Sequence, residues 1–551
     1  MLLPMETNPE FPVFQVDLSE GWRSLLAGPF RQPLETRLLP KFIQRQRWFG
    51  GKAEAIEHTE ILDWFAIPDD TNMSNILLVM VNADLYAVFL SIAAGADRIL
   101  KDELECALAR LSTNAHDNLV LFDGLASSDS CLALLRLIKT GQHLPGATGA
   151  VQGIRTSACQ ELEGPDDELL SVRRNRAEQS NSSVLYGDRF ILKLFRHLHR
   201  GRNPDYEIGS YLTEQTDFRH SPRVAGAIEF KSSSSDHVIT LAVLHEFVVN
   251  QGDAWTYTID ELQRFFKRAS ERMDLLENLS KRQLSIAAMV DQDVPEELQT
   301  LLGDYARESR ILGTRTCELH LELARPTEDP AFRSGVLSKP ELRDMSRNMH
   351  DEVARLLRNL SDKLETLPEG LHAHVRQLCA LRREMISIVD SLPNTNTDIP
   401  KMRCHGDYHL GQVLRVSGDF VIIDFEGEPA KPLVERVKQQ TPITDIAGML
   451  RSFSYATFAS LLLFARNSIE DLQRFLPWAR ICQSWVMVAF LKAYLAAAEG
   501  SAILPADRSD FFQVLHALML EKALYELDYE LNSRPDWLII PLYSILDYLQ
   551  Q

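Results

Sequence analysis

The chain has 551 residues, 45% of them hydrophobic and 25% charged, which is ordinary for a globular protein of several domains. Its net charge of −19 argues against nucleic acid or another polyanion as the main ligand. Seven scattered cysteines without a CxxC pair argue against a disulfide scaffold or a cysteine zinc site and indicate a cytoplasmic protein. The first residues show no signal-peptide pattern, and the longest apolar run, Trp485–Ala498, is too short to span a bilayer, so we expect no membrane partner.

Residues 1–39 contain several prolines and predict a mobile leader around one short helix. The stretch that follows, Leu38–Lys52, reads LLPKFIQRQRWFGGK. It predicts a helix that ends at the Gly-Gly pair, with Trp48 and Phe49 packed into a core.

Residues 40–150 are expected to form a small α+β domain. Ile76–Ile92 predicts a pair of strands about Asn82-Ala83-Asp84, and Cys131–Ile138 is a further strand candidate. A glycine-rich stretch, Gly141–Gly153, joins this domain to the next.

The segment that begins at Glu178 reads EQSNSSVLYGDRFILKLF. Two apolar runs around Gly187-Asp188 predict a β-hairpin. The polar turn that enters it can lay backbone N–H groups and small hydroxyls over phosphates. Such turns are also common on surfaces, and this one lacks the glycines of a GxGxxG loop. The candidate cofactor-binding residues of this turn are Ser180, Asn181, Ser182 and Ser183.

Lys193 lies on the second strand of this hairpin, in the position of the phosphate-binding lysine of kinases. A lone strand lysine can also be an edge or snorkelling residue. A functional lysine here needs a carboxylate partner on the next helix, which Asn203-Pro204-Asp205 begins. We expect this partner to be Glu207, with Asp205 as the alternative, although a first-turn acid can also simply favour the helix dipole.

Val238–Asn250 predicts a strongly apolar strand. In a kinase it would be the last strand of the N-terminal lobe and the hinge, with the backbone from Glu246 to Val248 at the adenine. The alternative is a central buried strand without a binding role. We assign residues 151–252 to a β-rich, nucleotide-binding lobe.

Residues 253–551 predict a mostly helical lobe that carries the catalytic loop and the acceptor cleft. His320 is expected to face the core of this lobe and not to bind a ligand. The stretch around 290–400 predicts an insertion with a solvated face. The expected helices are Tyr257–Met273, Leu298–Ala324, Glu341–Leu367, Leu371–Leu392 and Asp445–Phe464.

Cys404–Pro429 reads CHGDYHLGQVLRVSGDFVIIDFEGEP and predicts another β-hairpin, about Ser417-Gly418-Asp419. Asp407 precedes the hairpin, Gln412 follows five residues later, and Asp424 leaves the second strand. This is the layout of a kinase catalytic loop followed by its metal-binding aspartate. The pattern therefore indicates phosphoryl transfer.

The chemistry explains these residue types. Asp407 is the candidate base that orients the acceptor hydroxyl and takes its proton. Gln412 and Asp424 offer the hard oxygen ligands that Mg²⁺ prefers. The alternative, a simple turn with Asp424 as a helix cap, is disfavoured by three elements at matching spacing. Further candidates for substrate or structural roles are His405, His409, Glu426, Asp445 and Arg451.

Asp445 and Arg451 lie on the helix that follows the hairpin. Asp445 can be only a neighbour of the N-cap, or it can brace the backbone of the catalytic loop. Arg451 is expected within reach of one side of the cleft.

The segments RQRWFGGK, EQSNSS with FILKLF, VLHEFV, HGDYHLGQ, IDFEGEP and TDIAGMLRSF together resemble bacterial maltokinases, which also occur as the C-terminal half of trehalose synthase fusions. The resemblance runs from about Arg45 to Tyr455. It implies an α+β, bilobal, aminoglycoside-phosphotransferase-like kinase fold behind an N-terminal cap domain over residues 40–150. It also implies that ATP and Mg²⁺ are used to phosphorylate maltose to maltose 1-phosphate, which feeds α-glucan (glycogen) synthesis, and that trehalose synthase is a candidate partner.

Two features depart from the expected pattern. The motif at Asp424–Glu426 is DFE and not DFG, so Glu426 is a candidate extra metal or structural group. The RWFGGK segment also occurs in glucosamine kinases. The alternatives are therefore a kinase of the same fold that acts on glucosamine or another amino sugar or aminoglycoside, and a non-catalytic pseudokinase, which the intact Lys193 and Asp407 disfavour.

Overall fold

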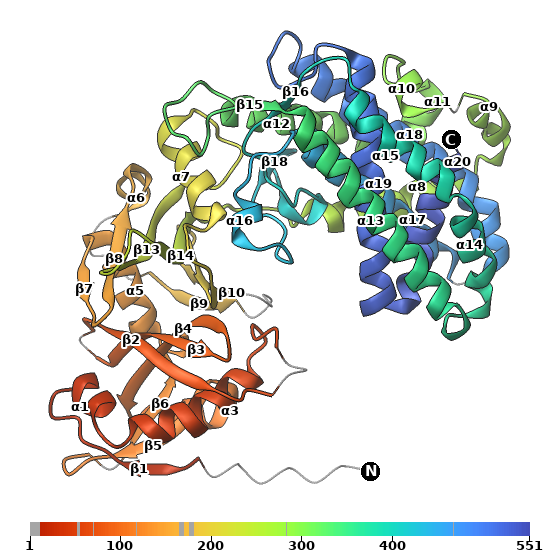
Figure 1. The fold of residues 1–551 in the computed structure, drawn as a ribbon. Coiled ribbons are helices and arrows are strands. Elements are labelled where there is room, and N and C mark those ends of the chain that lie inside the picture. The colour runs from red at the N-terminus through yellow and green to blue at the C-terminus, as the bar shows by residue number, and fades with distance from the viewer. Residues whose placement is uncertain are drawn as a thin grey trace. The chain divides into compact units, whose positions relative to one another are not determined.

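The computed structural model describes residues 11–51, 55–69, 71–116, 118–164, 170–175, 181–282, 284–466 and 468–550. The chain divides into two compact units (Figure 1). Met1–Gln215 and Pro222–Val249 form the N-terminal unit, and Thr216–Ser221 and Asn250–Gln551 form the C-terminal unit.

The first sheet of the N-terminal unit has the strand order β1-β5-β6-β4-β3-β2, with β12 paired to β4. Its strands are β1 (Val13–Gln15), β2 (Thr59–Ile67), β3 (Met73–Val81), β4 (Asp84–Ala94), β5 (Ala107–Ser112), β6 (Leu119–Asp123) and β12 (His197–Leu198). The predicted strand pair over 76–92 is confirmed as β3 and β4. Both strands read as unbroken apolar runs because both of their faces are buried, with Ile76 and Leu77 in different hydrophobic clusters.

Short helices cover one face of this sheet: α1 (Trp22–Ala27), α2 (Arg31–Pro33), η1 (Leu34–Leu38) and α3 (Leu39–Arg45). The short helix predicted within residues 1–39 is confirmed as α1, and residues 11–39 pack on the first sheet instead of forming a separate leader. Trp22 is buried in the cluster beneath β3 and β4, and β1 pairs with β5, because the apolar side chains of this segment need the sheet to cover them. Trp48 and Phe49 lie in the same cluster, as predicted, although α3 ends earlier than the Gly-Gly pair.

The second sheet has the order β7-β8-β13-β14-β11-β10-β9. Its strands are β7 (His143–Pro145), β8 (Gly149–Arg155), β9 (Val172–Asn175), β10 (Asn181–Tyr186), β11 (Phe190–Phe195), β13 (Val224–Ser232) and β14 (Val238–Glu246). The predicted hairpin about Gly187-Asp188 is confirmed as β10 and β11, and the predicted strand over 238–250 is confirmed as β14.

The strand expected over Cys131–Ile138 is wrong: these residues lie in the helix α5 (Ser128–Thr140). The Ser127 hydroxyl accepts a hydrogen bond from the Ser130 N–H at its start, and Gly141 ends it in a left-handed conformation. The helix packs against strands of both sheets, and its exposed stripe, which holds Asp129, Arg136 and Thr140, falls almost entirely outside the apolar run, so the eight residues of the run contain one polar side chain and show no clear period. The other helices of this unit are α4 (Ile99–Asp102), α6 (Ser157–Leu162) and α7 (Pro204–Gln215).

One hydrophobic cluster contains residues of both sheets and of α5. The predicted boundary at 150/151 falls within β8. The division into domains at 40–150, 151–252 and 253–551 stays a prediction.

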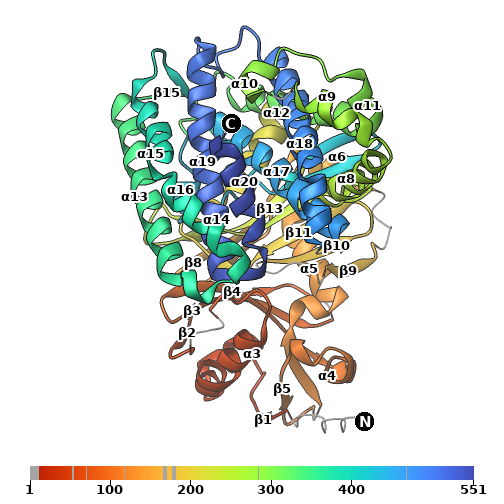
Figure 2. The ribbon, with the colours of Figure 1, turned by 90° about the vertical axis from the view of Figure 1, so that its right-hand side faces the viewer.

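The C-terminal unit is mostly helical, as expected, and Figure 2 shows α13, α15 and α19 side by side. Its helices are α8 (Ala254–Ser270), α9 (Leu276–Ser280), α10 (Ile286–Met289), α11 (Glu296–Leu302), α12 (Tyr305–Leu323), α13 (Lys339–Lys363), α14 (Glu369–Ala380), α15 (Arg382–Ser391), α16 (Leu433–Arg436), α17 (Ile443–Ala465), α18 (Ile469–Ala497), α19 (Arg508–Ser533) and α20 (Ile539–Gln550). Its short strands form two pairs: β15 (Gly335–Leu337) with β16 (Ile399–Lys401), and β17 (Val413–Val416) with β18 (Asp419–Ile422).

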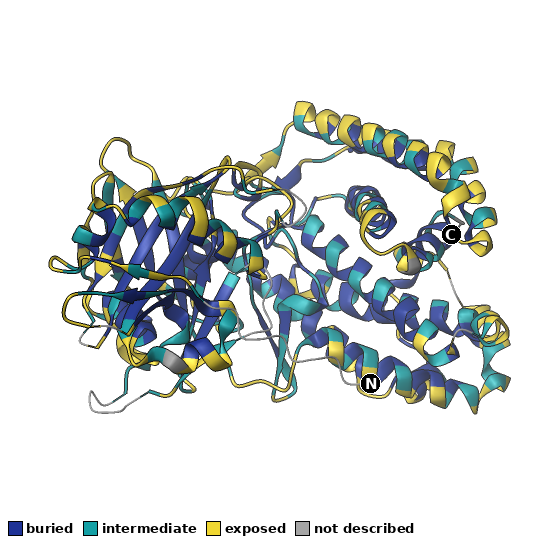
Figure 3. Ribbon diagram, turned by 90° about the horizontal axis from the view of Figure 1, so that it is seen from below, coloured by how far each residue is buried: buried dark blue, intermediate teal, exposed yellow. Residues whose placement is uncertain are grey.

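Buried residues, dark blue in Figure 3, occupy the inner faces of these helices. Among the described helices, α17 is long and apolar enough to cross a membrane by length and composition, and 78% of its most apolar window is buried in the structure. Such burial is typical of a core helix.

Candidate active site

The β17–β18 hairpin joins two polar residues at its base. Gln412 ends the short helix η8 (Leu410–Gln412) before β17, and Asp424 follows β18. The Gln412 Nε2 donates a hydrogen bond to Asp424 Oδ2 over 2.8 Å, and the Ile423 N–H donates to the Gln412 carbonyl over 3.0 Å. The predicted hairpin is confirmed, and the two predicted metal ligands are in contact.

Asp424 has a backbone φ of 67°, in the left-handed region that residues other than glycine rarely adopt. Strained backbone of this kind gathers at functional sites. The Gln412 amide and the Asp424 carboxylate present oxygen donors, which is the ligand chemistry that Mg²⁺ requires. These residues therefore fit a Mg²⁺ ion, and their role as its ligands stays a prediction.

Asp407 is partly open to solvent, with 27% of its side chain exposed. The Nε2 atom of His409 lies 4.0 Å from Asp407 Oδ2. His409 Nδ1 accepts a hydrogen bond from the Gly411 N–H over 3.0 Å, so the proton of the neutral imidazole is on Nε2, the nitrogen nearest Asp407. This arrangement leaves the Asp407 carboxylate accessible for an acceptor hydroxyl.

Asp445 braces the loop that carries Asp407. Its carboxylate is buried and accepts hydrogen bonds from the backbone N–H groups of His405 (2.8 Å) and Gly406 (2.9 Å). Burial alone raises the pKa of Asp445, but the hydrogen bond and charge of His320 more than offset this, so the pKa is below its usual value. The bracing role considered for Asp445 is the one that the contacts support.

His320 is buried, as predicted, between this carboxylate and the Tyr494 hydroxyl, at 3.1 and 2.8 Å. The helix α17 also lies close to the loop that carries Asp407: a Cβ atom at Gly448 would be 2.6 Å from the Tyr408 carbonyl oxygen. Glycine is therefore required at this position.

The remaining tentative residues of this unit make structural contacts. The buried His405 places its Nε2 2.9 Å from the Ile423 carbonyl oxygen, which links the loop that carries Asp407 to the end of the hairpin. Arg451 was expected beside the cleft, but it is buried and pairs with Glu526 over 2.6 Å. Glu426 lies 3.9 Å from the Arg436 guanidinium, which also donates to the Glu426 carbonyl.

In the N-terminal unit, Lys193 lies on β11, where it pairs with Ser183 of β10 and with Val243 of β14. Its Nζ is 3.6 Å from Asp205 Oδ2, so the ion pair in the structure is with the alternative partner, Asp205. Glu207, the expected partner, is two residues further along α7, on another side of the helix, and is half-buried. Asp205 is also 3.3 Å from His245 Nε2.

The polar turn predicted over phosphates is only partly described, and Ser180 lies outside the described residues. Asn181, Ser182 and Ser183 belong to the strand β10 and not to a turn. Ser182 and Ser183 are buried, and the Ser182 hydroxyl accepts a hydrogen bond from Arg196 Nε over 2.9 Å. The Ser182 side chain therefore has a hydrogen-bond partner within the protein.

The predicted hinge begins at Glu246, the last residue of β14. The Glu246 N–H donates to the Arg223 carbonyl and its carboxylate pairs with the Arg223 guanidinium over 2.8 Å. The Phe247 N–H donates to the Arg189 carbonyl over 2.7 Å. Val248, immediately before the point where the chain passes to the C-terminal unit, remains the candidate for the adenine contact.

Sequence reasoning did not anticipate a charged cluster near Asp407. The buried Glu428 carboxylate lies 3.0 Å from Lys431 Nζ and 3.6 Å from Lys522 Nζ. Burial, then the charge and hydrogen bond of Glu428, and more weakly the charge of Asp407, raise the pKa of Tyr525.

Tyr525 begins a row of exposed aromatic side chains. Tyr529 and Trp537, on α19 and just after it, are 48% and 42% exposed. The Arg534 guanidinium carbon lies 5.4 Å from the Tyr529 ring centre and 5.5 Å from that of Trp537, which orients both rings. The signal in the sequence was the Tyr-x-x-x-Tyr spacing, which puts both rings on one face of a helix.

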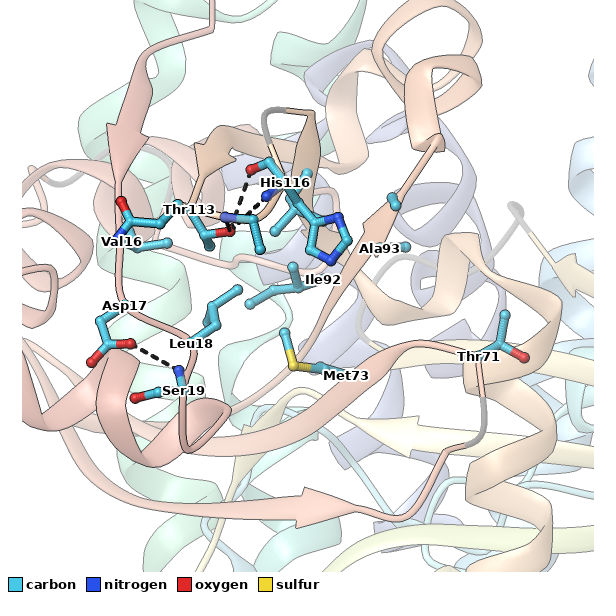
Figure 4. Close-up of a pocket in the computed structure, with 14 residues that line it drawn as sticks. Val16, Asp17, Leu18, Ser19, Thr71, Met73, Ile92, Ala93, Thr113 and His116 are labelled. Atoms are coloured by element: carbon cyan, nitrogen blue, oxygen red, sulfur yellow. Dashed lines mark hydrogen bonds between the residues drawn. The ribbon is translucent and has the colours of Figure 1, made fainter.

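A separate pocket of about 630 Å³ lies in the N-terminal unit (Figure 4). Its lining combines apolar Leu18, Met73 and Ile92 with polar Asp17 and His116. These residues come from the first sheet and the segments that join its strands, whereas Lys193 and the other predicted nucleotide residues lie on the second sheet or in segments next to it.

Comparison with known proteins places the chain among kinases. Residues 42–126 match the model of the Maltokinase N-terminal cap domain. A glucosamine kinase of Mycolicibacterium smegmatis is 25% identical over 370 residues, which cover 66% of this chain and 76% of that protein. A glucosamine kinase of Streptacidiphilus jiangxiensis is 21% identical over 421 residues, covering 75% and 81%.

Solved glucosamine kinase structures share the fold at 16% identity. The complex with glucosamine, ADP and inorganic phosphate gives a TM-score of 0.59 and covers 92% of this chain and 96% of that one. A second crystal form gives 0.61, covering 93% and 97%. The predicted kinase fold with an N-terminal cap domain is confirmed, and so is the enzyme class, a phosphotransferase.

Proposed function

We propose that the protein is an ATP- and Mg²⁺-dependent maltokinase, which transfers the γ-phosphoryl group of ATP to the anomeric hydroxyl of maltose and releases ADP and maltose 1-phosphate. The contact between Gln412 and Asp424, beyond the loop that carries Asp407, supports phosphoryl transfer. The match of residues 42–126 to the maltokinase cap supports maltose as the acceptor.

In this reaction Asp407 accepts the proton of the acceptor hydroxyl as its oxygen bonds to the γ-phosphorus and the bond to ADP breaks. Gln412 and Asp424 would hold Mg²⁺, which when bound neutralises charge on the phosphates. The braces from Asp445 and His405 keep the Asp407 loop in one conformation.

Lys193, held by Asp205, would contact the α- and β-phosphates. The contact with Asp205 supports it over Glu207 as the positioning acid. Val248 and Asn181 stay candidates for nucleotide contacts. The Glu246 N–H and the Ser182 hydroxyl are bonded within the protein.

The exposed aromatic row supports a carbohydrate acceptor of more than one ring. Tyr525 interacts with the buried Glu428, and Tyr529 and Trp537 follow it on α19 and just after that helix. Flat aromatic faces are suited to the apolar faces of sugar rings. We propose that the glucose at the reducing end of maltose lies at Asp407 and that its second glucose packs on this row.

The second candidate is a kinase that acts on glucosamine, which the names of the curated relatives favour. An amino sugar is a cation at neutral pH and needs an available carboxylate. Glu428 is already paired with Lys431 and Lys522, and these lysines would repel a second cation, which favours a neutral acceptor.

A cytoplasmic location, a role in supplying α-glucan synthesis, and trehalose synthase as a partner complete the proposal. They rest on the resemblance to maltokinases and on the scattered cysteines.

The deciding experiment is a coupled ADP-release assay with Mg-ATP and a panel of maltose, glucose, glucosamine and trehalose. Turnover with maltose, and a phosphate on the anomeric carbon by ³¹P and ¹³C NMR, is the expected result. Turnover with glucosamine alone would replace maltose by the second candidate. If none of the four sugars supports ADP release, none of them is the acceptor, and the proposed maltokinase activity is refuted.

A further inference from the structure

Asp123, the last residue of β6 in the first sheet, has a completely buried carboxylate that holds two arginines. Arg196 Nη2 donates to Asp123 Oδ1 and Oδ2 over 3.3 and 3.0 Å. Arg174 Nη2 lies 3.7 Å from Asp123 Oδ2. One negative charge therefore serves two guanidinium groups inside the protein.

Arg196 is itself fully buried and links the two sheets. Its Nε donates to the Ser182 hydroxyl on β10 over 2.9 Å, and its backbone carbonyl accepts from the Ala87 N–H of β4. Its guanidinium carbon is 5.1 Å from the ring centre of Trp48, in the RQRWFGGK segment. The Arg196 side chain therefore contacts a carboxylate of the first sheet and the aromatic face of Trp48, and the Arg196 backbone is bonded to β4.

Arg174 is on β9, on the other side of β10. Its Nη1 contacts the buried Cys106 Sγ at 2.9 Å, so its side chain is also directed into the first sheet. Since β9 and β11 both pair with β10, and Arg196 directly follows β11, Asp123 fixes the strands on either side of β10.

These strands carry the proposed nucleotide residues. Lys193 is three residues before Arg196 and pairs with Ser183, while Ser182 is bonded directly to Arg196. A change in the position of Arg196 would therefore move the strand that aims Lys193 and the start of β10.

We propose that Asp123 is a positioning residue for the nucleotide: from the N-terminal cap it fixes, through Arg196 and Arg174, the strands that present Lys193 to the phosphates. This rests on the proposed use of ATP. In this proposal the cap domain contributes to nucleotide binding, and Trp48 helps to hold Arg196 in place by packing against its guanidinium group.

Asp123→Asn tests this role, because it keeps the shape of the side chain and removes the charge that both arginines share. We expect the KM for ATP to rise about tenfold, with kcat and the KM for the acceptor sugar within about twofold of wild type. A loss of fold alone would lower the amount of active enzyme, and so the apparent kcat, without this selective change in the KM for ATP.

Asp63→Asn is the matched control. Asp63 is also a buried carboxylate of the first sheet, and it accepts hydrogen bonds from the Ala147 and Thr148 N–H groups of the turn between β7 and β8. It should lower the melting temperature while leaving the KM for ATP unchanged.

If Asp123→Asn does not fold, Arg174→Gln tests the proposal instead. Arg174 is partly exposed, and its replacement leaves the ion pair between Arg196 and Asp123 in place. We then expect a rise of about threefold in the KM for ATP. A folded Asp123→Asn, or in its absence Arg174→Gln, with a wild-type KM for ATP would overturn the proposal, and so would an equal rise in Asp63→Asn. Equilibrium binding of ADP distinguishes failure of this proposal from failure of the proposed function. Wild-type protein that binds no ADP would overturn the proposed function as well.

Discussion

Asp445 accepts a hydrogen bond from the backbone N–H of Gly406 over 2.9 Å and so joins the first turn of α17 to the loop that carries Asp407. The carboxylate also holds the His405 N–H and lies 3.1 Å from His320 Nε2. One buried side chain thus satisfies several polar groups that would otherwise be unpaired in the core.

We expect Asp445→Asn to destabilise the protein by about 3 kcal/mol, because the loop N–H groups and His320 lose a buried charged partner. We also expect kcat to fall by at least about tenfold, since the Asp407 loop becomes less ordered. Calorimetry and steady-state kinetics measure the two effects. A variant with wild-type stability and turnover would show that the brace has no role.

Asp407→Asn should reduce kcat by at least about 100-fold, because an amide cannot accept the proton of the acceptor hydroxyl. The affinity for Mg-ATP should stay within about twofold, because the nucleotide does not need this carboxylate. Turnover assays combined with equilibrium nucleotide binding check both parts. Retained turnover would refute Asp407 as the base.

Asp424→Asn should weaken Mg-ATP binding on the order of 10- to 100-fold and raise the Mg²⁺ concentration needed for half-maximal activity. Asp419→Asn is a suitable control, because Asp419 is on the same hairpin but pairs with Arg315 over 2.7 Å. Titration of Mg²⁺ at fixed ATP distinguishes them. If both substitutions weaken Mg-ATP binding equally, the cause is a disturbed hairpin and not the removal of a metal ligand.

Trp537→Ala should raise the KM for maltose by roughly three- to tenfold, since one aromatic stacking contact is lost. The KM for glucose, if glucose is a substrate, should change less, because a single ring at Asp407 does not reach this end of the row. Kinetics with both sugars provide the comparison. Equal changes for the two sugars would argue against a second ring on Trp537.

Glu352 on α13 gives a prediction for pH. Burial, and then the nearby Glu521 carboxylate, raise the pKa of Glu352 from 4.5 to about 7. Between these values the folded protein keeps a proton that the unfolded chain has lost, so the stability contributed by this group falls as the pH rises from about 4.5 to about 7.

Glu352→Gln should therefore be stabilised relative to wild type at pH 8 and much less so at pH 5, with melting temperatures recorded at both values. A difference of the same size at both pH values would mean that the pKa of Glu352 is not raised.

The sequence alone determined the elements that depend on neighbouring residues. The turn at Ser417-Gly418-Asp419 and the apolar runs beside it predicted the catalytic hairpin, because a few residues fix the backbone conformation of a tight turn. The same holds for β10 and β11, and therefore for the strand position of Lys193. The spacing of Asp407, Gln412 and Asp424 was informative for the same reason.

The tertiary structure decided whatever depends on distant partners. The run Cys131–Ile138 lies in a helix that packs against both sheets, and eight residues with one polar side chain, Arg136, are too few to distinguish a helix from a buried strand. The choice of Asp205 over Glu207 depended on which side of α7 faces Lys193, since two positions turn a helix by roughly 200°. Asp123 and Arg196 are 73 residues apart, and only the packing of two sheets brings that carboxylate to that guanidinium.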